Sequence, residues 1–215
     1  MRAGPLKWTW LGSVPYAEAH RRQLERRAAI QKQGATEEIW LLEHPAVVTT
    51  GRRPAPGTPD RQTLAALGVE SFRTERGGLA TFHGPGQLVT YLLIDIGARN
   101  IKVRTLVRTI EQDIIDWLSS QGVPAHRRSG APGVWSGTLK LAALGLHISR
   151  GVTMHGAALN LHTDLSGFSL IVPCGITDGG VTSLAALTGT APSPQEAAFQ
   201  LGPALATAIE NITIN

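Results

Sequence analysis

Cys174 is the side chain of this sequence best suited to covalent chemistry. It is the one cysteine among 215 residues, and it lies between Pro173 and Gly175 at the end of a mostly apolar run that begins at Phe168. A lone thiol forms no internal disulfide, so any role depends on the reactivity of its thiolate. Structural cysteines usually lie in the middle of a strand or helix, whereas the flanking proline and glycine predict a thiol at the edge of a folded core. We therefore expect Cys174 to be a nucleophile.

Lys140 is the second candidate, in a predicted strand of mostly apolar and small residues. Alternate residues of a strand share a face, which places Lys140 with Ala142 and Leu144. One interpretation is an outward-facing lysine on an edge strand, the more common situation for a lone lysine. The other is a partly desolvated amine, whose pKa would fall and which would be available for proton transfer. The residues alone leave both open.

A glycine-rich segment from Arg76 to Gly86 contains His83 and joins two strand patterns. Its glycines allow the backbone to approach a ligand closely and to offer N–H groups to a carbonyl or phosphate. A plain hairpin turn would also satisfy the tetrapeptide that begins at His83. A second His-Gly pair, at His155, follows later in the chain. The segment has no dinucleotide or P-loop pattern, so it implies no nucleotide.

Metal binding is not expected from the sequence. His155 and His162 are ligand types, but no second cysteine or carboxylate cluster completes a four-ligand set. The alternative interpretation of both is a core or hydrogen-bonding histidine.

The composition describes a folded protein with a basic balance. Hydrophobic residues make up 42% of the chain, the formal net charge is +4, and aromatic residues amount to 5%. The scattered arginines without interleaved aromatics argue against a nucleic-acid partner, and an acidic protein fits the charge equally well. The N-terminus lacks the apolar run of a signal peptide, and no apolar stretch is long enough to cross a bilayer. We expect a cytoplasmic chain with no membrane association, folded as a single domain over residues 1–215.

Periodicity predicts helices over residues 16–33, 62–67, 104–121 and from 193 toward 209, and Ala17, Leu24 and Ala28 form the predicted apolar face of the first. The last helix opens with a capping box at Ser193. Strands are predicted at residues 39–43, 47–50, 69–74, 79–82, 87–94, 134–135, 138–148 and 152–161. The fold class is α/β (α+β), a mixed and largely antiparallel sheet with flanking helices.

Taken together, these segments resemble the octanoyltransferases of lipoate biosynthesis. The resemblance is carried by four motifs and by Leu41 to Pro45 with Thr50 to Arg52 upstream; the four motifs are Arg76 to Val89, Lys140 to Gly145, His155 to Asn160, and Pro173 to Gly175. It covers nearly the whole chain. Phe82, Thr90 and Gly151 depart from the residues common in the family.

The resemblance implies the catalytic fold of biotin and lipoate protein ligases and an acyltransferase activity without a cofactor. The donor would be octanoyl-acyl carrier protein, and the acceptors would be lipoyl domains of 2-oxoacid dehydrogenases and glycine cleavage H-type proteins. Cys174 matches the acyl-thioester nucleophile, Lys140 matches the lysine that lowers its pKa, and His155 is a supporting candidate. The implied substrate-binding residues are Arg76, Gly77, Gly78, Leu79, Ala80, Thr81, Phe82, His83, Ala143, Leu144, Gly145, Gly156, Ala157 and Ala158.

The chemistry of an acyl transfer also needs donors for the tetrahedral oxyanion. Backbone N–H groups near Gly77 and Gly78, or at Gly145, are the candidates. Three other activities stay open: an ATP-dependent lipoate or biotin ligase of the same fold, an acyl thioesterase with water as acceptor, and a basic nucleic-acid-binding module.

Overall fold

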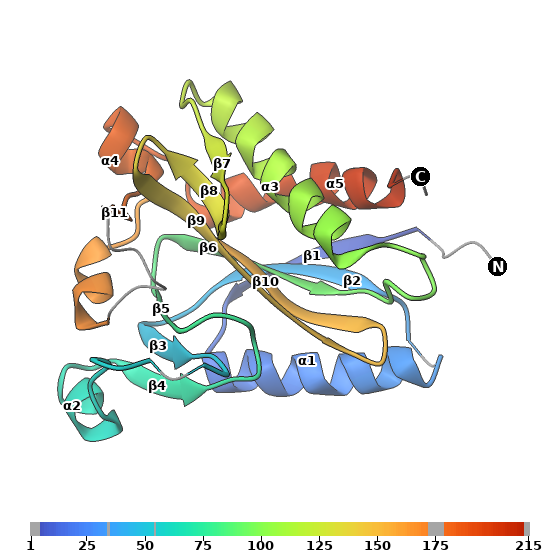
Figure 1. Ribbon diagram of the computed structural model, residues 1–215, viewed down its shortest axis with the longest axis horizontal. Coiled ribbons are helices and arrows are strands. Elements are labelled where there is room, and N and C mark those ends of the chain that lie inside the picture. Colours follow the sequence, from blue (N-terminus) through green and yellow to red (C-terminus); the bar gives the residue numbers. More distant parts are fainter. Residues whose placement is uncertain (1–4, 34, 54, 172–178, 213–215) are drawn as a thin grey trace.

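A computed structural model describes residues 5–33, 35–53, 55–171 and 179–212. Its main sheet is eight-stranded, in the order β1-β2-β6-β10-β9-β8-β7, and β11 pairs with β9 (Figure 1). These strands are β1 (Lys7–Ser13), β2 (Glu38–Glu43), β6 (Gln87–Leu93), β7 (His126–Arg128), β8 (Ala131–Ser136), β9 (Leu139–Ser149), β10 (Val152–Asn160) and β11 (Gly180–Val181).

Most neighbours in the main sheet are antiparallel, and β1 with β2 and β11 with β9 are the parallel pairs. A separate three-stranded sheet has the order β4-β3-β5, with β3 (Val47–Thr50) between β4 (Glu70–Arg73) and β5 (Ala80–His83). The sheet of mixed direction confirms the predicted fold class, and the second small sheet is an addition that the strand patterns did not reveal.

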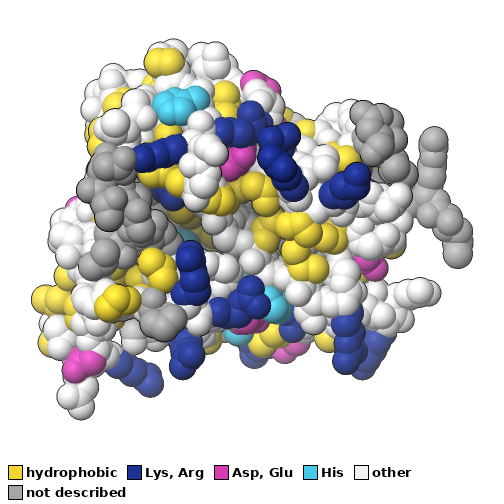
Figure 2. All heavy atoms as spheres, in the orientation of Figure 1, with side chains coloured by type: hydrophobic (Ala, Val, Ile, Leu, Met, Phe, Trp, Pro, Cys, Tyr) yellow, Lys and Arg dark blue, Asp and Glu magenta, His cyan; other side chains and the backbone are white. Residues whose placement is uncertain are grey.

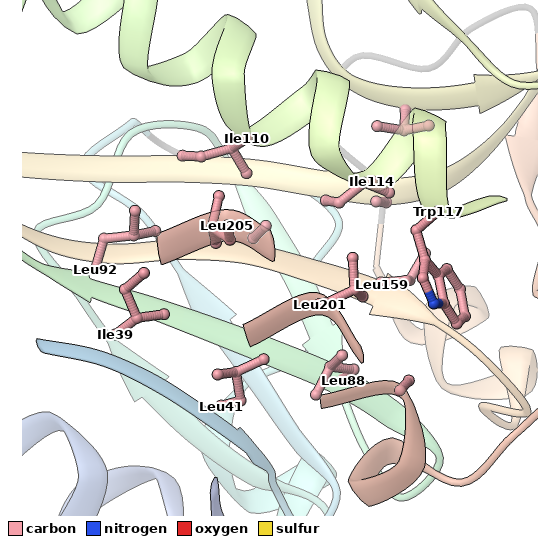
Figure 3. Close-up of a cluster of buried hydrophobic side chains, with 14 of the residues drawn as sticks. Ile39, Leu41, Leu88, Leu92, Ile110, Ile114, Trp117, Leu159, Leu201 and Leu205 are labelled. Atoms are coloured by element: carbon pink, nitrogen blue, oxygen red, sulfur yellow. The ribbon is translucent and has the colours of Figure 1, made fainter. Parts of the chain in front are cut away.

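Helices lie on both faces of the main sheet (Figure 1). On one face α3 (Val103–Ser120) and α5 (Pro194–Glu210) contact each other and bury aliphatic residues against β2, β6 and β10. Figure 3 shows this core, in which Ile110, Ile114 and Trp117 of α3 lie near Leu201 and Leu205 of α5. The predicted capping box of α5 is present, since Glu196 N donates to Ser193 Oγ and Ser193 N donates to Glu196 Oε2.

The first helix, α1 (Tyr16–Gln31), covers the opposite face. Its predicted apolar face is wrong for two of three residues: Ala17 and Ala28 are exposed, whereas Leu24 packs against the core. The buried residues of the helix are Tyr16, Ala19, Gln23 and Ile30. The physical reason is that the inner face mixes apolar and polar residues: Ala19 and Ile30 pack in an apolar cluster with residues of the sheet, whereas buried Gln23 accepts a hydrogen bond from His155 N. Aliphatic periodicity therefore carries little information about this helix.

Shorter elements complete the described fold: α2 (Arg61–Ala66), the 3₁₀ helix η1 (Leu165–Leu170) and α4 (Leu184–Thr188). Asp60 caps α2 by accepting a hydrogen bond from Thr63 N. Among the residues described, no helix combines the length and apolar character that a membrane crossing requires.

Candidate active site

A cavity of about 540 Å³ lies over β9 and β10, between α3 and the loop that runs from Arg76 to Leu79. Val103 and Val107 of α3 line one wall, and Arg76 and His83 line another. This face of the molecule is hollowed in Figure 2, with Lys and Arg side chains around the hollow and few Asp or Glu. The volume is that of an ordinary small-molecule site, ~300–1,000 Å³.

Most of the site residues expected from the sequence lie around this cavity. The residues that line it are Arg76, Gly77, Gly78, Leu79, Ala80, Thr81, His83, Lys140, Ala143, Leu144, Gly145, His155, Gly156, Ala157 and Ala158. Phe82 does not line it, because its ring packs against Phe168, 5.6 Å away between centroids, in a separate apolar cluster. Cys174 lies outside the described residues.

Lys140 is a buried residue of the cavity wall, with 8% of its surface exposed. Its Nζ donates to Pro132 O over 3.2 Å and lies 4.7 Å from the centroid of the Trp135 ring. Strand β9 is flanked by β8 and β11 at this position, so the lysine is not on an edge strand. The interpretation of Lys140 as an outward-facing surface lysine is therefore wrong, and the ammonium group sits on an aromatic face in a water-poor setting.

The described residues on both sides of the gap at residues 172–178 reach the same cavity. Phe168 precedes the gap and Val181 follows it, and both line the cavity. Val181 is paired with Lys140 in the parallel β11–β9 ladder, and Thr182 N donates to Lys140 O over 3.0 Å. The chain that contains the lone cysteine thus leaves and re-enters the described structure at the wall of the cavity.

A buried chain of hydrogen bonds starts at His83 and runs beneath the cavity. His83 Nδ1 and Gln87 Oε1 are 2.7 Å apart, Gln87 Nε2 donates to Asn160 Oδ1 over 2.9 Å, and Asn160 Nδ2 donates to Thr182 O over 2.9 Å. Because the carbonyl of Thr182 can only accept, it fixes the orientation of the Asn160 amide, which in turn fixes that of the Gln87 amide. Gln87 Oε1 must accept, hence His83 Nδ1 carries the proton and Nε2 presents a lone pair.

Burial keeps this group of imidazoles neutral. Desolvation lowers the pKa of His83 to about 3 and that of His44 to about 4. His44 Nδ1 donates to Val14 O over 2.5 Å, which leaves its Nε2 to accept from the Tyr91 hydroxyl at 2.7 Å. Burial likewise raises the pKa of Tyr91 above its usual range. His83 and Tyr91 thus face the cavity as neutral polar groups beside the charged guanidinium of Arg76.

Arg76 holds the glycine-rich loop against β3. Its Nη2 donates to Thr49 O over 2.6 Å and its Nη1 donates to Gly77 O over 3.0 Å, with the side chain buried. Gly77 N donates to Leu146 O of β9 over 3.2 Å, and this bond engages one of the N–H groups that the sequence suggested for an oxyanion. The candidates that remain are Gly78 and Gly145.

Several residues at the site were missed by sequence reasoning. Gln87 and Asn160 belong to the motifs that carry the resemblance but were not assigned to the site, although a buried amide in an apolar strand is a usable signal. Tyr16 and Tyr91 also line the cavity, and so do Val103 and Val107 of α3. The two valines follow the apolar periodicity of the helix, which does not distinguish a cavity wall from a core.

Comparisons with known proteins agree with this geometry. The family described as the lipoyl protein ligase A/B catalytic domain matches residues 15–206. An octanoyltransferase of Solibacter usitatus is 48% identical over 183 residues, which cover 82% of this chain and 81% of that protein. A solved candidate lipoate protein ligase of T. acidophilum is 18% identical with a TM-score of 0.70, over 96% of this chain and 85% of that one.

A third similarity is to the biotin protein ligase of Aquifex aeolicus in complex with biotin and ATP. It is 13% identical with a TM-score of 0.55, over 95% of this chain and 70% of that one, and it bears on the fold alone. The chain belongs to the lipoyl protein ligase A/B catalytic domain family. It is an acyltransferase with the fold of lipoate and biotin protein ligases, as the resemblance implied.

Proposed function

We propose that this acyltransferase moves an octanoyl group from octanoyl-acyl carrier protein to a lysine of lipoyl domains, through a thioester on Cys174. The observation that carries the proposal is Lys140, a lysine buried at the wall of the cavity and paired with the strand that follows the cysteine segment. The name of the Solibacter relative supports the octanoyl group as cargo.

In the first step, the Cys174 thiolate attacks the carbonyl carbon of the donor thioester. The bond to the carrier sulfur breaks, the carrier thiolate leaves and takes up a proton, and the acyl group stays on Cys174. A lysine close to a thiol favours the thiolate, as an ammonium through its positive charge or as a neutral amine by accepting the thiol proton. Its ammonium form then protonates the departing carrier thiolate, which leaves the lysine neutral for the second step. One thioester replaces another, so the exchange is close to neutral in energy.

In the second step, the neutral amine of the acceptor lysine attacks the acyl carbon on Cys174. The new C–N bond replaces the C–S bond, the Cys174 thiolate is restored, and a base removes the extra amine proton. Lys140 is the base in this proposal. Amide formation from a thioester runs downhill, so the reaction needs no ATP.

The walls of the cavity suit an acyl chain followed by a polar carbonyl. Val107 and Leu144 supply apolar surface, and Gly145 lets the backbone of β9 approach the ligand closely. Gly78 and Gly145 are the proposed sources of N–H groups for the oxyanion. The net charge of +4 suits a carrier protein that is acidic.

Intact mass spectrometry tests the proposal. Incubation with octanoyl-acyl carrier protein should add one octanoyl mass to the wild-type chain and none to Cys174→Ala. Addition of a lipoyl domain should then discharge the adduct and add the same mass to that domain. Normal transfer by Cys174→Ala would overturn the nucleophile, pyrophosphate release from ATP would identify a ligase, and free octanoate without an acceptor would identify a thioesterase.

Lys140→Arg and Lys140→Met separate the two roles of the lysine. Arginine keeps the positive charge and stays protonated, whereas methionine removes both charge and base. We expect Lys140→Arg to retain the fast alkylation of the thiol near neutral pH and to lose the second step, and Lys140→Met to lose both. Lys102→Met, at an exposed lysine before α3, is the matched control.

A further inference from the structure

A second cluster of potential ligand side chains lies under α1, beside the acyl cavity, and neither step of the proposed acyl transfer uses it. It consists of His20 of α1, Glu75 of the loop after β4, and His155 of β10. One ligand atom from each, two imidazole nitrogens and a carboxylate oxygen, lies within 4.8 Å of the others. We propose that these three residues form a binding site for one divalent transition-metal ion, with Zn²⁺ as the best match.

The distances between the donor atoms fit such an ion. His20 Nε2 and Glu75 Oε2 are 2.9 Å apart, and His155 Nε2 and Glu75 Oε2 are 4.0 Å apart. Tetrahedral Zn²⁺ with bonds of ~2.0–2.1 Å holds neighbouring ligand atoms ~3.3 Å apart, between the two observed values. Two histidines and one carboxylate form a three-ligand set that leaves the fourth position for water.

His155 supplies an observation independent of this clustering. Its side chain is 3% exposed, and among the described residues its Nε2 has no hydrogen-bond partner, although it lies 4.0 Å from Glu75 Oε2. A buried polar atom without a partner costs about 1–3 kcal/mol, so such atoms in folded proteins generally have a ligand or water. Burial lowers the pKa of His155 to about 3, which keeps the ring neutral, and neutral imidazole is the form that binds metals.

The backbone holds the His155 ring in this direction against its own preference. His155 has φ of 61°, in the left-handed region that non-glycine residues rarely occupy, and its N–H donates to Gln23 Oε1 over 2.8 Å. Strain of this kind persists where the surroundings over-determine the conformation. Because His155 also lines the cavity, a bound ion would lie next to the acyl site.

The sequence alone pointed away from a metal. The two histidines that it offered as ligands were His155 and His162, and His162 is exposed and does not belong to this cluster. The partners that the fold provides, His20 and Glu75, lie 55 residues apart in sequence and have no motif spacing. The site goes beyond the proposed acyl transfer, and its failure would leave that proposal intact.

Zinc binding by tag-free protein tests the site. The background is Cys174→Ser, since a thiolate is itself a zinc ligand. Titration against a chromogenic chelator should give one Zn²⁺ per chain, and Co²⁺ in its place should show the visible absorption of a tetrahedral ion. Stoichiometry well below one, or the absorption of a six-coordinate aquated ion at every Co²⁺ concentration, would overturn the proposal.

Two substitutions remove ligands with little change of shape. Asparagine tolerates the left-handed backbone, so His155→Asn keeps the conformation while removing the ring, and Glu75→Gln is isosteric. Each should weaken Zn²⁺ binding at least ~10-fold, the lower end of what even outer-shell changes cost. His126→Ala, at an exposed histidine of β7, should bind as the background does. Equal affinity in all variants would contradict the site, and a urea midpoint measured without metal identifies any variant that fails to fold. If His155→Asn or Glu75→Gln fails to fold, His20→Asn removes a ligand in its place and is measured in the same way.

Discussion

Gln87 Nε2 donates to Asn160 Oδ1 over 2.9 Å, and this bond joins the first residue of β6 to the last residue of β10, both of which line the cavity. The pair lies in the middle of the chain that runs from His83 to Thr182 O. Thr182 N in turn donates to Lys140 O. The imidazole tautomer at one end of the site and the backbone of the buried lysine at the other are thereby coupled through two amides.

Replacement of Gln87 by leucine should therefore destabilise the fold. The substitution removes Gln87 Oε1 and also Gln87 Nε2, which donates two hydrogen bonds. The buried atoms His83 Nδ1 and Asn160 Oδ1 then lose these partners. A buried group left unsatisfied costs about 1–3 kcal/mol. We expect the free energy of unfolding in urea to fall by that amount or more, whereas Gln112→Leu, at an exposed amide of α3, should change it by less than ~0.5 kcal/mol.

Gly145 and Gly156 pair with each other across β9 and β10, and alanine at the two positions should affect different properties, activity at Gly145 and stability at Gly156. A Cβ at Gly156 would collide with Thr90 O and lie 2.7 Å from Leu92 Cδ1, so Gly156→Ala should lower the thermal midpoint sharply. A Cβ at Gly145 would lie 3.3 Å from Gly77 O and 3.6 Å from Arg76 Cδ, which is close but tolerable.

Gly145→Ala should consequently fold and narrow the cavity, with acyl transfer reduced more than stability. Thermal melts and initial rates of the two variants measure the contrast. A Gly156→Ala protein as stable as wild type, or a Gly145→Ala protein with unchanged transfer, would contradict the assigned roles.

Arg76→Lys should loosen the loop although it keeps the charge. A lysine cannot make both the Thr49 O and the Gly77 O bonds, because it lacks the planar fork of a guanidinium. We expect a higher KM for the acyl donor and faster proteolysis between β4 and β5. Arg53→Lys is the control, since Arg53 also lines the cavity but is exposed, and it should leave proteolysis unchanged.

Acid should destabilise the protein through its buried histidines. His44 and His83 have pKa values lowered to about 4 and about 3 from 6.5, so below pH 6.5 the unfolded chain binds protons that the folded one does not. Stability is thus complete above about pH 6.5 and falls as the pH decreases toward these folded values. Asp113 has the opposite sign, because burial and then Asp116 raise its pKa to about 7.

Urea midpoints across this pH window, in an Asp113→Asn background, isolate the histidine contribution. His44→Gln should flatten the decrease, and His126→Gln, at the exposed position on β7, should leave it unchanged. A midpoint that stays constant from about pH 7 to about pH 5 would show that the folded and unfolded states bind equal numbers of protons there.

The elements that sequence predicts best are those whose signal is local. The apolar stripe of α3 and the capping box at Ser193 appear in the structure close to the predicted bounds. Strand β1 is not among the predicted strands, although Lys7 to Trp10 alternate polar and aromatic residues and Trp8 and Trp10 pack on the core. The two-residue β11 has no local signal at all, since it exists through its pairing with β9.

For the site, sequence patterns favoured residues in motifs and overlooked those brought together by the fold. The cavity gathers Arg76, Lys140 and His155 as the motifs suggested. His20 joins His155 only through the packing of α1 on β10, and Glu75 only through the course of the loop after β4. The burial of Lys140 depends on Trp135 and Pro132 of β8, so it could not be decided from the alternation of its own strand.

Helix α3 presents two separate stripes, and this separation has an evolutionary consequence. Leu106, Ile110 and Leu118 belong to the core, whereas Val103 and Val107 look onto the cavity, and Val103 is 43% exposed. Substitutions at the two valines change the dimensions of the cavity while the core stripe stays intact. If the cavity holds the acyl group as proposed, single substitutions at these valines can therefore favour longer or shorter acyl groups during evolution, and each intermediate protein still folds.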